Sequence, residues 1–331
     1  AGTHTLALRG DTAPLDWNMG VTLTADASGV FSYRFAANPA GPVAYKPLLD
    51  DATWSRGANY SVKPGQTVDV WPHFFATHGT VEKLFPAFHS NVLDDDRGVW
   101  AYLPPSYDEN PLATYPVVYM QDGQNLFDPA LAFGGNEWKV DETLDGAAEG
   151  DGAIRELIVI GPENDANRIY EYTPTTDPTT PGGGGADLYL RMLIEELKPQ
   201  VDAMLRTQPG SQTTGIVGSS LGGLLAAYAG VTHPDTFGLV GAMSPSTWWN
   251  SNWILGDVGT MTTPRPARVY VDCGQPDDDY VDTTQLVAAY LGRGYVEGAD
   301  FQHVYQLNAQ HNEVYWAERL PGALAFLFGP R

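Results

Sequence analysis

The chain contains very little cysteine and little positive charge. Its 331 residues include a single cysteine, Cys273, so no disulfide bond can form within the chain. Lysine and arginine together number 18 against 40 aspartates and glutamates, which gives a formal net charge of −22. A field of this sign repels phosphate backbones and anionic lipids, and we therefore expect no nucleic-acid partner. The acidic residues are spread along the chain, which indicates a solubility feature rather than a binding tail.

Long apolar runs and phosphate-binding signatures are missing as well. No stretch approaches the ~20 consecutive apolar residues of a membrane span, so we expect no insertion into a membrane. The Gly182–Gly185 run lacks the lysine and the preceding strand of a phosphate-binding loop. The chain begins Ala-Gly-Thr without a methionine, which fits a mature secreted or periplasmic protein.

Residues 1–82 have the pattern of a separate all-β domain. Apolar and polar residues alternate with period two in short segments that turn-forming residues separate. These segments are Thr5–Leu8, Val21–Thr24, Val30–Phe35, Val43–Lys46 and Thr67–Trp71. Several short strands at this spacing predict a small β-sandwich. We interpret Trp17 and Trp54 as core or interdomain residues, in preference to exposed residues that stack on sugar rings.

Residues 83–331 change to strands that alternate with helices. Gly98–Pro105 and Leu157–Ile160 read as strands, and Tyr115–Asp122 is nearly all apolar, as a strand covered on both faces should be. From Leu188 to Leu205 the apolar residues recur at helical spacing, in a helix that Pro199 should interrupt. This alternation predicts an α/β domain with a mostly parallel central sheet.

The segment Thr214–Gly230 is the one around which we expect the second domain to be organised. It is a short apolar strand, a sharp turn and a helix of small residues, and the turn matches G-x-S-x-G at Gly218–Gly222. In a nucleophile elbow the central serine has a strained backbone that exposes its hydroxyl above the sheet. We therefore predict Ser220 as a nucleophile; the alternative is a glycine-rich turn that only packs a helix onto a sheet.

A serine nucleophile needs a base, and the base needs an orienting carboxylate. In α/β-hydrolases the acid and the histidine follow the serine, in that order, on loops after late strands. His311 is placed on such a loop and is our predicted base. For the acid we prefer Asp277, because of its spacing after Gly274, with Asp278 as the alternative. This chemistry requires neither a cofactor nor a metal.

Acyl transfer also needs hydrogen-bond donors for the oxyanion of the tetrahedral intermediate. One donor is the backbone N–H of the residue after the nucleophile, Leu221. The second should come from the loop after an early central strand, and we assign it to the N–H of Gln124.

Several segments of residues 85–331 together resemble one known family. They are Asp122–Phe127, Arg168–Pro174, Gly218–Gly223, Ser244–Trp249 and His311–Glu313. The set resembles the putative-esterase (esterase D-like) family, which includes feruloyl, acetylxylan and enterobactin esterases, S-formylglutathione hydrolases and mycolyltransferases. The resemblance implies an α/β-hydrolase fold with Ser220 as nucleophile, His311 as base, and Gln124 and Leu221 as oxyanion donors. It places the acid in the Gly274–Asp279 turn without choosing the residue.

The first domain has a resemblance of its own. The residues between Tyr45 and Tyr60 are similar to the later strands of immunoglobulin-like modules of the starch- and glycogen-binding type. A β-sandwich before the esterase is common in secreted and siderophore-directed members of the family. The formylglutathione hydrolases lack this extra domain, which makes the glutathione adduct a poor substrate for this chain.

Aromatic residues are concentrated on the loops at the predicted catalytic edge. We predict that Trp248, Trp249 and Trp138 line the substrate site, where they would suit a flat aromatic acyl group or a sugar ring. The alternative is that they only anchor loops. For Arg168 we expect an ion pair with Glu171 in preference to a contact with a substrate carboxylate.

These observations lead to three hypotheses about function. The first is a serine carboxylesterase that acts through an acyl-enzyme on a small-molecule or polysaccharide-linked ester, of the feruloyl or acetyl type. The second is hydrolysis of a siderophore trilactone or a polyester; the scarcity of arginine weighs against a catecholate siderophore. The third is a carbohydrate-binding protein with an inactive hydrolase domain, which the order of serine, acid and histidine argues against.

Overall fold

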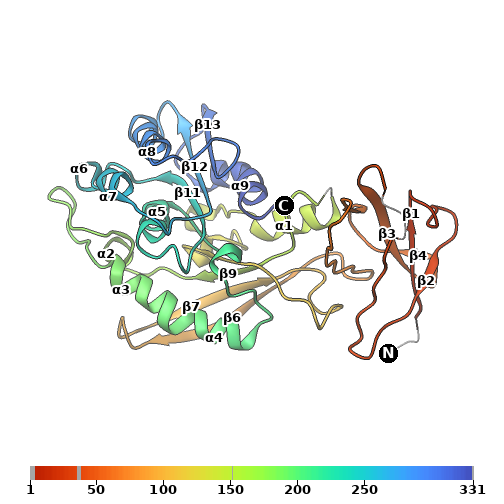
Figure 1. Ribbon diagram of the computed structural model, residues 1–331. Helices are drawn as coiled ribbons and strands as arrows, with labels where there is room; N and C mark the ends of the chain where they lie inside the picture. Colours follow the sequence, from red (N-terminus) through yellow and green to blue (C-terminus); the bar gives the residue numbers. More distant parts are fainter. Residues whose placement is uncertain (1–3, 36–38, 151, 330–331) are drawn as a thin grey trace.

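The structure is a computed structural model that describes residues 4–35, 39–150 and 152–329. It has two parts, a small sheet built from the N-terminal residues and a larger body in which helices cover a central sheet (Figure 1). The strand Thr80–Ser90 (β6) already belongs to the larger sheet. This strand begins before residue 83, and the domain boundary expected at 82/83 stays a prediction.

The N-terminal part is one antiparallel sheet, and its described residues do not form the second sheet of the predicted sandwich. The strand order is β2-β1-β3-β4, and β5 also pairs with β3. The bounds are Leu6–Gly10 (β1), Val21–Leu23 (β2), Val43–Leu49 (β3), Thr53–Trp54 (β4) and Tyr60–Val62 (β5). A small cluster around Leu8, Leu15, Val43, Tyr45 and Val62 forms its core.

Two strands predicted for this part are wrong. Val30–Phe35 contributes only one isolated bridge, between Ala25 and Phe31, and Thr67–Trp71 forms no strand. Most residues of both segments are exposed or only partly buried, so their alternation has no core face to occupy. Trp17 and Trp54 are also not core residues, since they are 37% and 39% exposed and lie against each other at a centroid distance of 6.2 Å.

The larger part contains an eight-stranded, mostly parallel sheet, as predicted. Its strand order is β13-β12-β11-β10-β8-β9-β7-β6, in which the β6–β7 and β7–β9 pairs are antiparallel and the other pairs are parallel. The bounds not yet given are Asp95–Leu103 (β7), Val117–Met120 (β8), Ile158–Pro162 (β9), Thr214–Ser220 (β10), Leu239–Pro245 (β11), Arg268–Gln275 (β12) and Phe301–Leu307 (β13). Because β10 to β13 are parallel neighbours, the loops after their carboxyl ends meet at one edge of the sheet.

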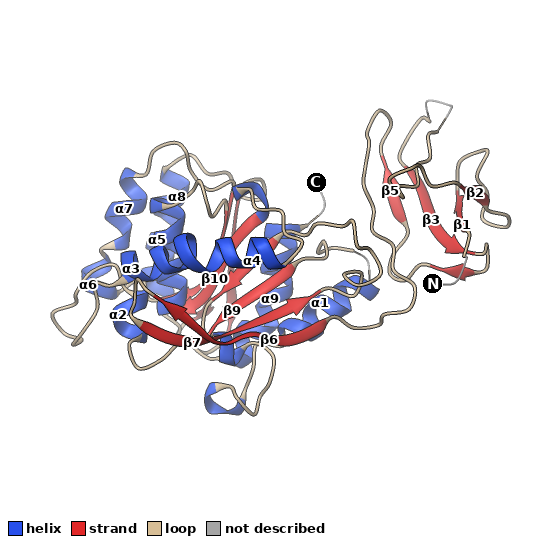
Figure 2. Cartoon of the chain, turned by 90° about the horizontal axis from the view of Figure 1, so that it is seen from below, coloured by secondary structure: helices blue, strands red, loops and turns tan. Residues whose placement is uncertain are grey.

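Helices cover both faces of this sheet (Figure 2). One core cluster contains residues of Ala186–Arg191 (α3), Lys198–Met204 (α4), Leu221–Thr232 (α5), Ile254–Thr260 (α7) and Tyr280–Gly292 (α8). The other contains residues of Val140–Glu149 (α1) and Glu313–Phe328 (α9), while the short helices Arg168–Tyr172 (α2) and Trp249–Asn252 (α6) lie at the loops. The β8 and β10 strands are buried along almost their whole length, which explains their continuous apolar sequence.

The helix predicted between Leu188 and Leu205 continues past Pro199, but not as a regular α-helix. The residues Met192–Leu197 form a π-helical segment that joins α3 to α4. Pro199 falls in the first turn of α4, where a proline without an N–H is tolerated. No helix in the described ranges is long and apolar enough to cross a membrane.

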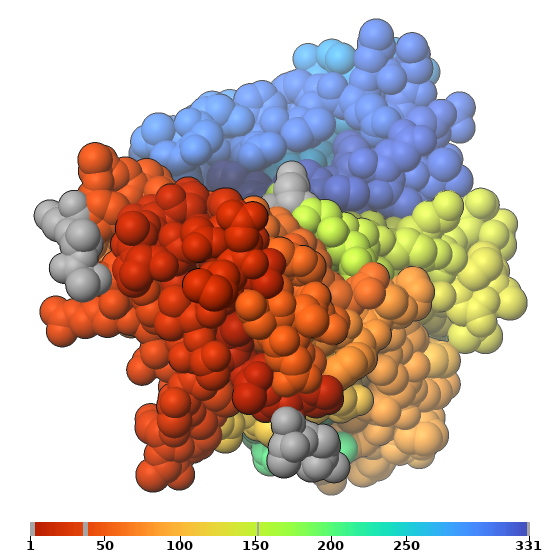
Figure 3. Space-filling model, turned by 90° about the vertical axis from the view of Figure 1, so that its right-hand side faces the viewer, coloured from red at the N-terminus to blue at the C-terminus, as the bar shows by residue number. Residues whose placement is uncertain are grey.

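The N-terminal sheet lies at one end of the larger part, and Figure 3 shows this end with the N-terminal residues towards the viewer. The contact includes an ion pair between Arg56 and Glu149, at the end of α1, with Nε–Oε1 at 2.5 Å. Gly57 approaches the same helix, since a Cβ atom there would lie 2.3 Å from the carbonyl oxygen of Ala148.

Candidate active site

The turn between β10 and α5 has the backbone that the sequence predicts. Ser220 has φ 56° and ψ −122°, a strained conformation for a residue with a side chain, and it is partly exposed. Gly218 cannot carry a Cβ, because that atom would lie 2.6 Å from the carbonyl of Gly222. At Gly223 a Cβ would lie 2.8 Å from the carbonyl oxygen of Met243 on β11. The glycines therefore allow α5 to start close against the sheet while the Ser220 side chain stands clear.

An acid and a histidine meet at the same sheet edge. Nδ1 of His311, on the loop after β13, lies 2.5 Å from Oδ1 of Asp278, on the loop after β12. The Asp278 side chain is fully buried, whereas that of His311 is 35% exposed. Burial acts to raise the pKa of Asp278, but hydrogen bonds from His311, Ser244 and the N–H of Gly274 outweigh it and hold the pKa below its usual value.

The preference for Asp277 as the acid is corrected in favour of the alternative, Asp278. The Asp277 side chain is exposed, while the turn folds back so that Asp278 Oδ2 accepts a hydrogen bond from the N–H of Gly274 at 2.6 Å. This backbone contact directs the second aspartate of the run, rather than the first, towards the neighbouring loop that carries His311. Spacing in the sequence does not specify how a turn folds back, so it could not separate the two residues.

The order of the strands brings Ser220 to the same edge of the sheet as this pair. β10, which ends at Ser220, is separated from β12 by β11 alone, and β13 follows β12. Within the described residues, no hydrogen bond joins Ser220 to His311; the Ser220 Oγ lies 3.4 Å from Oγ of Ser246 instead. The hydroxyl of Ser246 is therefore the hydrogen-bond partner of the Ser220 hydroxyl in this structure.

The loop after β8 is held rigidly next to the elbow. Gln124 lies in the 3₁₀ turn Gly123–Asn125, and a Cβ on Gly123 would lie 2.1 Å from the carbonyl oxygen of Gly161 on β9. Asp122 has a left-handed backbone with φ 60°, and its carboxylate accepts two hydrogen bonds from Arg168, at 2.7 and 2.8 Å. The side-chain amide of Asn164 donates to the same carboxylate.

The pairing of Arg168 differs from our expectation. Arg168 pairs with Asp122, and Glu171 pairs with Arg97 instead, at 2.8 Å between Nη2 and Oε1. Arg168 and Glu171 are three residues apart on α2, but Glu171 is turned into the core while Arg168 reaches Asp122 on the loop after β8. Arg168 therefore supports the loop on which Gln124 lies.

Of the three tryptophans predicted to line the substrate site, the structure leaves one accessible. Trp248 is 37% exposed, whereas Trp249 and Trp138 are only 2% and 1% exposed. Trp249 donates from Nε1 to the carbonyl of Thr175, and Trp138 packs on Trp316. The prediction is therefore wrong for Trp249 and Trp138, which are core residues that anchor loops.

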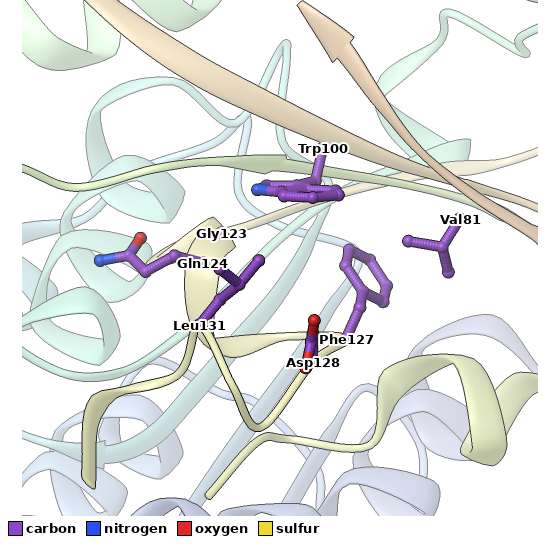
Figure 4. A pocket seen from close by; sticks show the side chains of 7 residues that line it. All are labelled: Val81, Trp100, Gly123, Gln124, Phe127, Asp128 and Leu131. Atoms are coloured by element: carbon purple, nitrogen blue, oxygen red, sulfur yellow. The ribbon is translucent and has the colours of Figure 1, made fainter. Parts of the chain in front are cut away.

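A small cavity of about 210 Å³ lies beside the loop after β8. Figure 4 shows the side chains of Trp100, Phe127 and Leu131 converging on it, with Gln124 at one end. Nε1 of Trp100 donates to Glu163, so the indole is held in place by its polar edge and presents its apolar face. Sequence reasoning did not single out Trp100, because it lies within a strand and not on a loop of the catalytic edge.

Among the residues that the structure describes, two groups of carboxylates are close enough together to hold a metal ion, and neither contains the proposed catalytic residues. In the group of Asp95, Asp165 and Glu171, Arg97 already pairs with two members. The other group is Glu137, Asp141 and Glu142 at the start of α1. Burial and the charge of Glu142 raise the pKa of Asp141 to about 7.

Comparison with known proteins identifies the family. The family described as "Putative esterase" matches residues 90–327. A curated relative, the uncharacterized protein YbbA of Bacillus subtilis, is 28% identical over 248 residues, which are 71% of this chain and 93% of that protein. The siderophore triacetylfusarinine C esterase of Aspergillus fumigatus is 34% identical over 141 residues, 42% of this chain; the match spans about half of the relative, 47% of its length.

Among solved structures, a ferulic acid esterase superimposes with a TM-score of 0.60 at 22% identity. The alignment covers 76% of this chain and 98% of that structure. At this level of identity the likeness establishes the α/β-hydrolase fold of the larger part and leaves the substrate open.

Proposed function

This chain belongs to the putative esterase family of carboxylic-ester hydrolases, and from that premise we propose that it is a serine esterase working through an acyl-enzyme on Ser220. His311 is the general base, Asp278 orients it, and the N–H groups of Gln124 and Leu221 stabilise the oxyanion. The observation that carries the proposal is the 2.5 Å contact between His311 and a fully buried Asp278, at the edge where the strained Ser220 turn also ends.

The contact with Asp278 determines how His311 would work. A carboxylate only accepts hydrogen bonds, so Nδ1 of His311 carries the proton and Nε2 is left with a free lone pair. Nε2 then takes the proton of the Ser220 hydroxyl as Oγ attacks the ester carbonyl, and returns it to the leaving alcohol. In the second half of the cycle His311 activates a water that cleaves the acyl-enzyme.

We propose an uncharged ester with an aromatic or carbohydrate part as the substrate, of the feruloyl or acetyl type. The cavity lined by Trp100 and Phe127 supports a flat apolar group next to Gln124, and the exposed Trp248 supports a second stacking surface. The acidic groups near the site support an uncharged substrate. Asp279 and Glu313 both interact with His311, and their carboxylates would repel an anion.

The second candidate is a siderophore ester, because several curated relatives carry that activity in their names. They include the triacetylfusarinine C esterase and the ferri-bacillibactin esterase of Bacillus subtilis, with 34% and 33% identity over parts of this chain. Arg168 and Arg319, which lie close to the proposed site residues, are already paired with Asp122 and Asp272. An anionic catecholate complex would therefore meet an acid-rich site, which places this candidate second.

Hydrolysis of p-nitrophenyl acetate by the wild type and by Ser220→Ala tests the proposal. We expect the variant to lose activity by at least roughly 10⁴-fold, since the triad acts as a unit. A fluorophosphonate should label Ser220 in the wild type and leave the variant unlabelled. Wild-type protein that neither turns over the ester nor takes the label would refute the enzyme proposal. Methyl ferulate and enterobactin assayed side by side decide between the two substrate classes.

A further inference from the structure

Behind the acid lies a buried polar cluster that the proposed catalytic cycle does not use. It consists of Ser244, Asp272, Trp316 and Arg319, and each of these residues is at most 6% exposed. Ser244 is the penultimate residue of β11 and has φ 38°, a left-handed backbone that is unusual for serine. A left-handed backbone is strained for a buried serine, and the contacts of the Ser244 hydroxyl explain why the protein keeps it.

The Ser244 hydroxyl has its hydrogen-bonding capacity fully used. Its Oγ accepts from Nε1 of Trp316 at 3.0 Å and from Nη2 of Arg319 at 2.8 Å. Indole and guanidinium groups can only donate, so the single hydrogen of the hydroxyl must point elsewhere. It points to Oδ2 of Asp278, 2.6 Å away. The two donors therefore fix the hydroxyl rotor in the one orientation that stabilises an ionised Asp278.

Charge in the cluster is balanced by Asp272. Nε of Arg319 lies 3.0 Å from Oδ2 of Asp272, and both side chains are at least 97% buried. Nη2 of Arg319 is also 3.8 Å from Oδ2 of Asp278. The other carboxylate oxygen of Asp272 accepts the N–H of Ser244, so the same pair holds the strained backbone in place.

We propose that Ser244, Trp316 and Arg319 form a positioning unit for Asp278, and that the Arg319–Asp272 pair tunes the basicity of His311. The inference rests on the proposed function and assigns these residues a role beyond it. Asp278 presents Oδ1 to His311 because Oδ2 is occupied by Ser244 and by the N–H of Gly274. Trp316 also packs edge-on against the imidazole, with ring centroids 5.1 Å apart, and limits its rotation.

The sharpest test of the tuning role compares two variants that change the charge of the cluster in opposite directions. Arg319→Met removes a cation near the Asp278–His311 pair, so the imidazolium becomes more favourable and the acid limb of kcat/KM moves to higher pH, by about 0.5 to 1 unit. In Asp272→Asn the positive charge of Arg319 is no longer balanced, so the acid limb of kcat/KM moves to lower pH. The double variant restores charge balance and should return the limb towards the wild type. The other ionisable groups that face His311 and Asp278, namely Asp279, Glu313 and Cys273, remain unchanged in all three.

Neutral variants test the hydroxyl itself. Ser244→Ala removes a hydrogen bond to a charged acceptor, and kcat should fall about 10- to 100-fold with KM nearly unchanged. Trp316→Phe keeps the ring against His311 but loses one donor, so a smaller fall in kcat is expected. Arg191→Met is the matched control, because Arg191 forms an exposed pair with Glu195 on a distant helix. This control should leave kcat and the pH profile as in the wild type.

Circular dichroism and thermal melts identify variants that fail to fold. If Arg319→Met or Asp272→Asn does not fold, the kcat values of Ser244→Ala and Trp316→Phe decide the test. Acid limbs that move in the same direction in Arg319→Met and Asp272→Asn, or do not move, would overturn the inference. The His311 pKa measured by NMR gives the same comparison without turnover. A wild type inactive on every ester would refute the proposed function, while opposite shifts of the His311 pKa would still support the tuning role.

Discussion

Asp278 is joined to His311 through one carboxylate oxygen and to the Ser244 hydroxyl through the other, at 2.5 and 2.6 Å. The acid is therefore held from both sides, and Nδ1 of the histidine is engaged while its side chain stays 35% exposed. This arrangement distinguishes Asp278 from Asp277, its exposed neighbour. The difference between two adjacent aspartates can be measured directly.

Substitution of the two aspartates should have very different effects on catalysis. Asp278→Asn is expected to lower kcat by about 10⁴-fold, because an amide can donate to His311 and stabilise the wrong tautomer. Asp277→Asn should remain within about 2-fold of the wild type, since surface changes away from the site are nearly neutral. Steady-state kinetics on p-nitrophenyl acetate measure kcat for both variants. A larger fall in kcat for Asp277→Asn than for Asp278→Asn would identify Asp277 as the acid.

The loop after β8, which carries the proposed oxyanion donor Gln124, should not tolerate a side chain at Gly123. In Gly123→Ala the new methyl would lie 2.1 Å from the carbonyl oxygen of Gly161, so the turn must shift and carry the N–H of Gln124 with it. Loss of one oxyanion donor typically costs ~10²–10³ in kcat. Gly146→Ala on α1 is the control, because no atom lies within 4 Å of the added methyl. That change should leave kcat unaltered and stabilise the helix by about 0.5–1 kcal/mol.

Trp248 and Trp249 are neighbours in sequence whose substitution should affect different properties. Trp249→Ala empties a buried position and is expected to lower the free energy of unfolding by about 3–5 kcal/mol. Trp248→Ala should leave stability nearly unchanged and raise KM for methyl ferulate more than for p-nitrophenyl acetate. Denaturant unfolding and the two KM values provide the measurements. Equal changes in both KM values would show that Trp248 does not contact the aromatic group.

Stability should depend on pH through Asp141. Burial and Glu142 raise its pKa to about 7 in the folded state, above the ordinary value of about 3.9 in an unfolded chain. The folded protein therefore binds the extra proton, and stability falls as pH rises from about 4 to about 7. Asp141→Asn removes this penalty, so its melting temperature should exceed that of the wild type by roughly 2 °C at pH 8, with a smaller difference at pH 4.

The same experiment should be run with EDTA and with added calcium, since Glu137 and Glu142 lie next to Asp141. Esterase activity should be unchanged in both conditions, because the proposed cycle involves no metal. A wild type that calcium stabilises at pH 8, while Asp141→Asn does not respond, would show that a cation rather than a proton relieves the repulsion.

Much of the site is determined by the sequence alone. The strand–turn–helix pattern around Ser220 requires its glycines for close backbone contacts, and such local geometry is encoded within a few residues. The alternation of strands and helices determined the parallel sheet, because a strand buried on both faces has a continuous apolar sequence. The order of serine, acid and histidine then places these residues on loops at one edge.

Only the tertiary structure decided which side chains that are far apart in the chain pair with each other. Sequence spacing favoured Asp277, but the backbone contact at Gly274 directs Asp278 to His311. Arg168 pairs with Asp122 and not with nearby Glu171, and Trp249 and Trp138 are buried although they lie on loops. Periodicity tells which residues share a face of one element, whereas burial and ion pairing depend on what packs against that face. Ser244, which looks like an ordinary strand residue, gains its role only when Trp316 and Arg319 of α9 reach it.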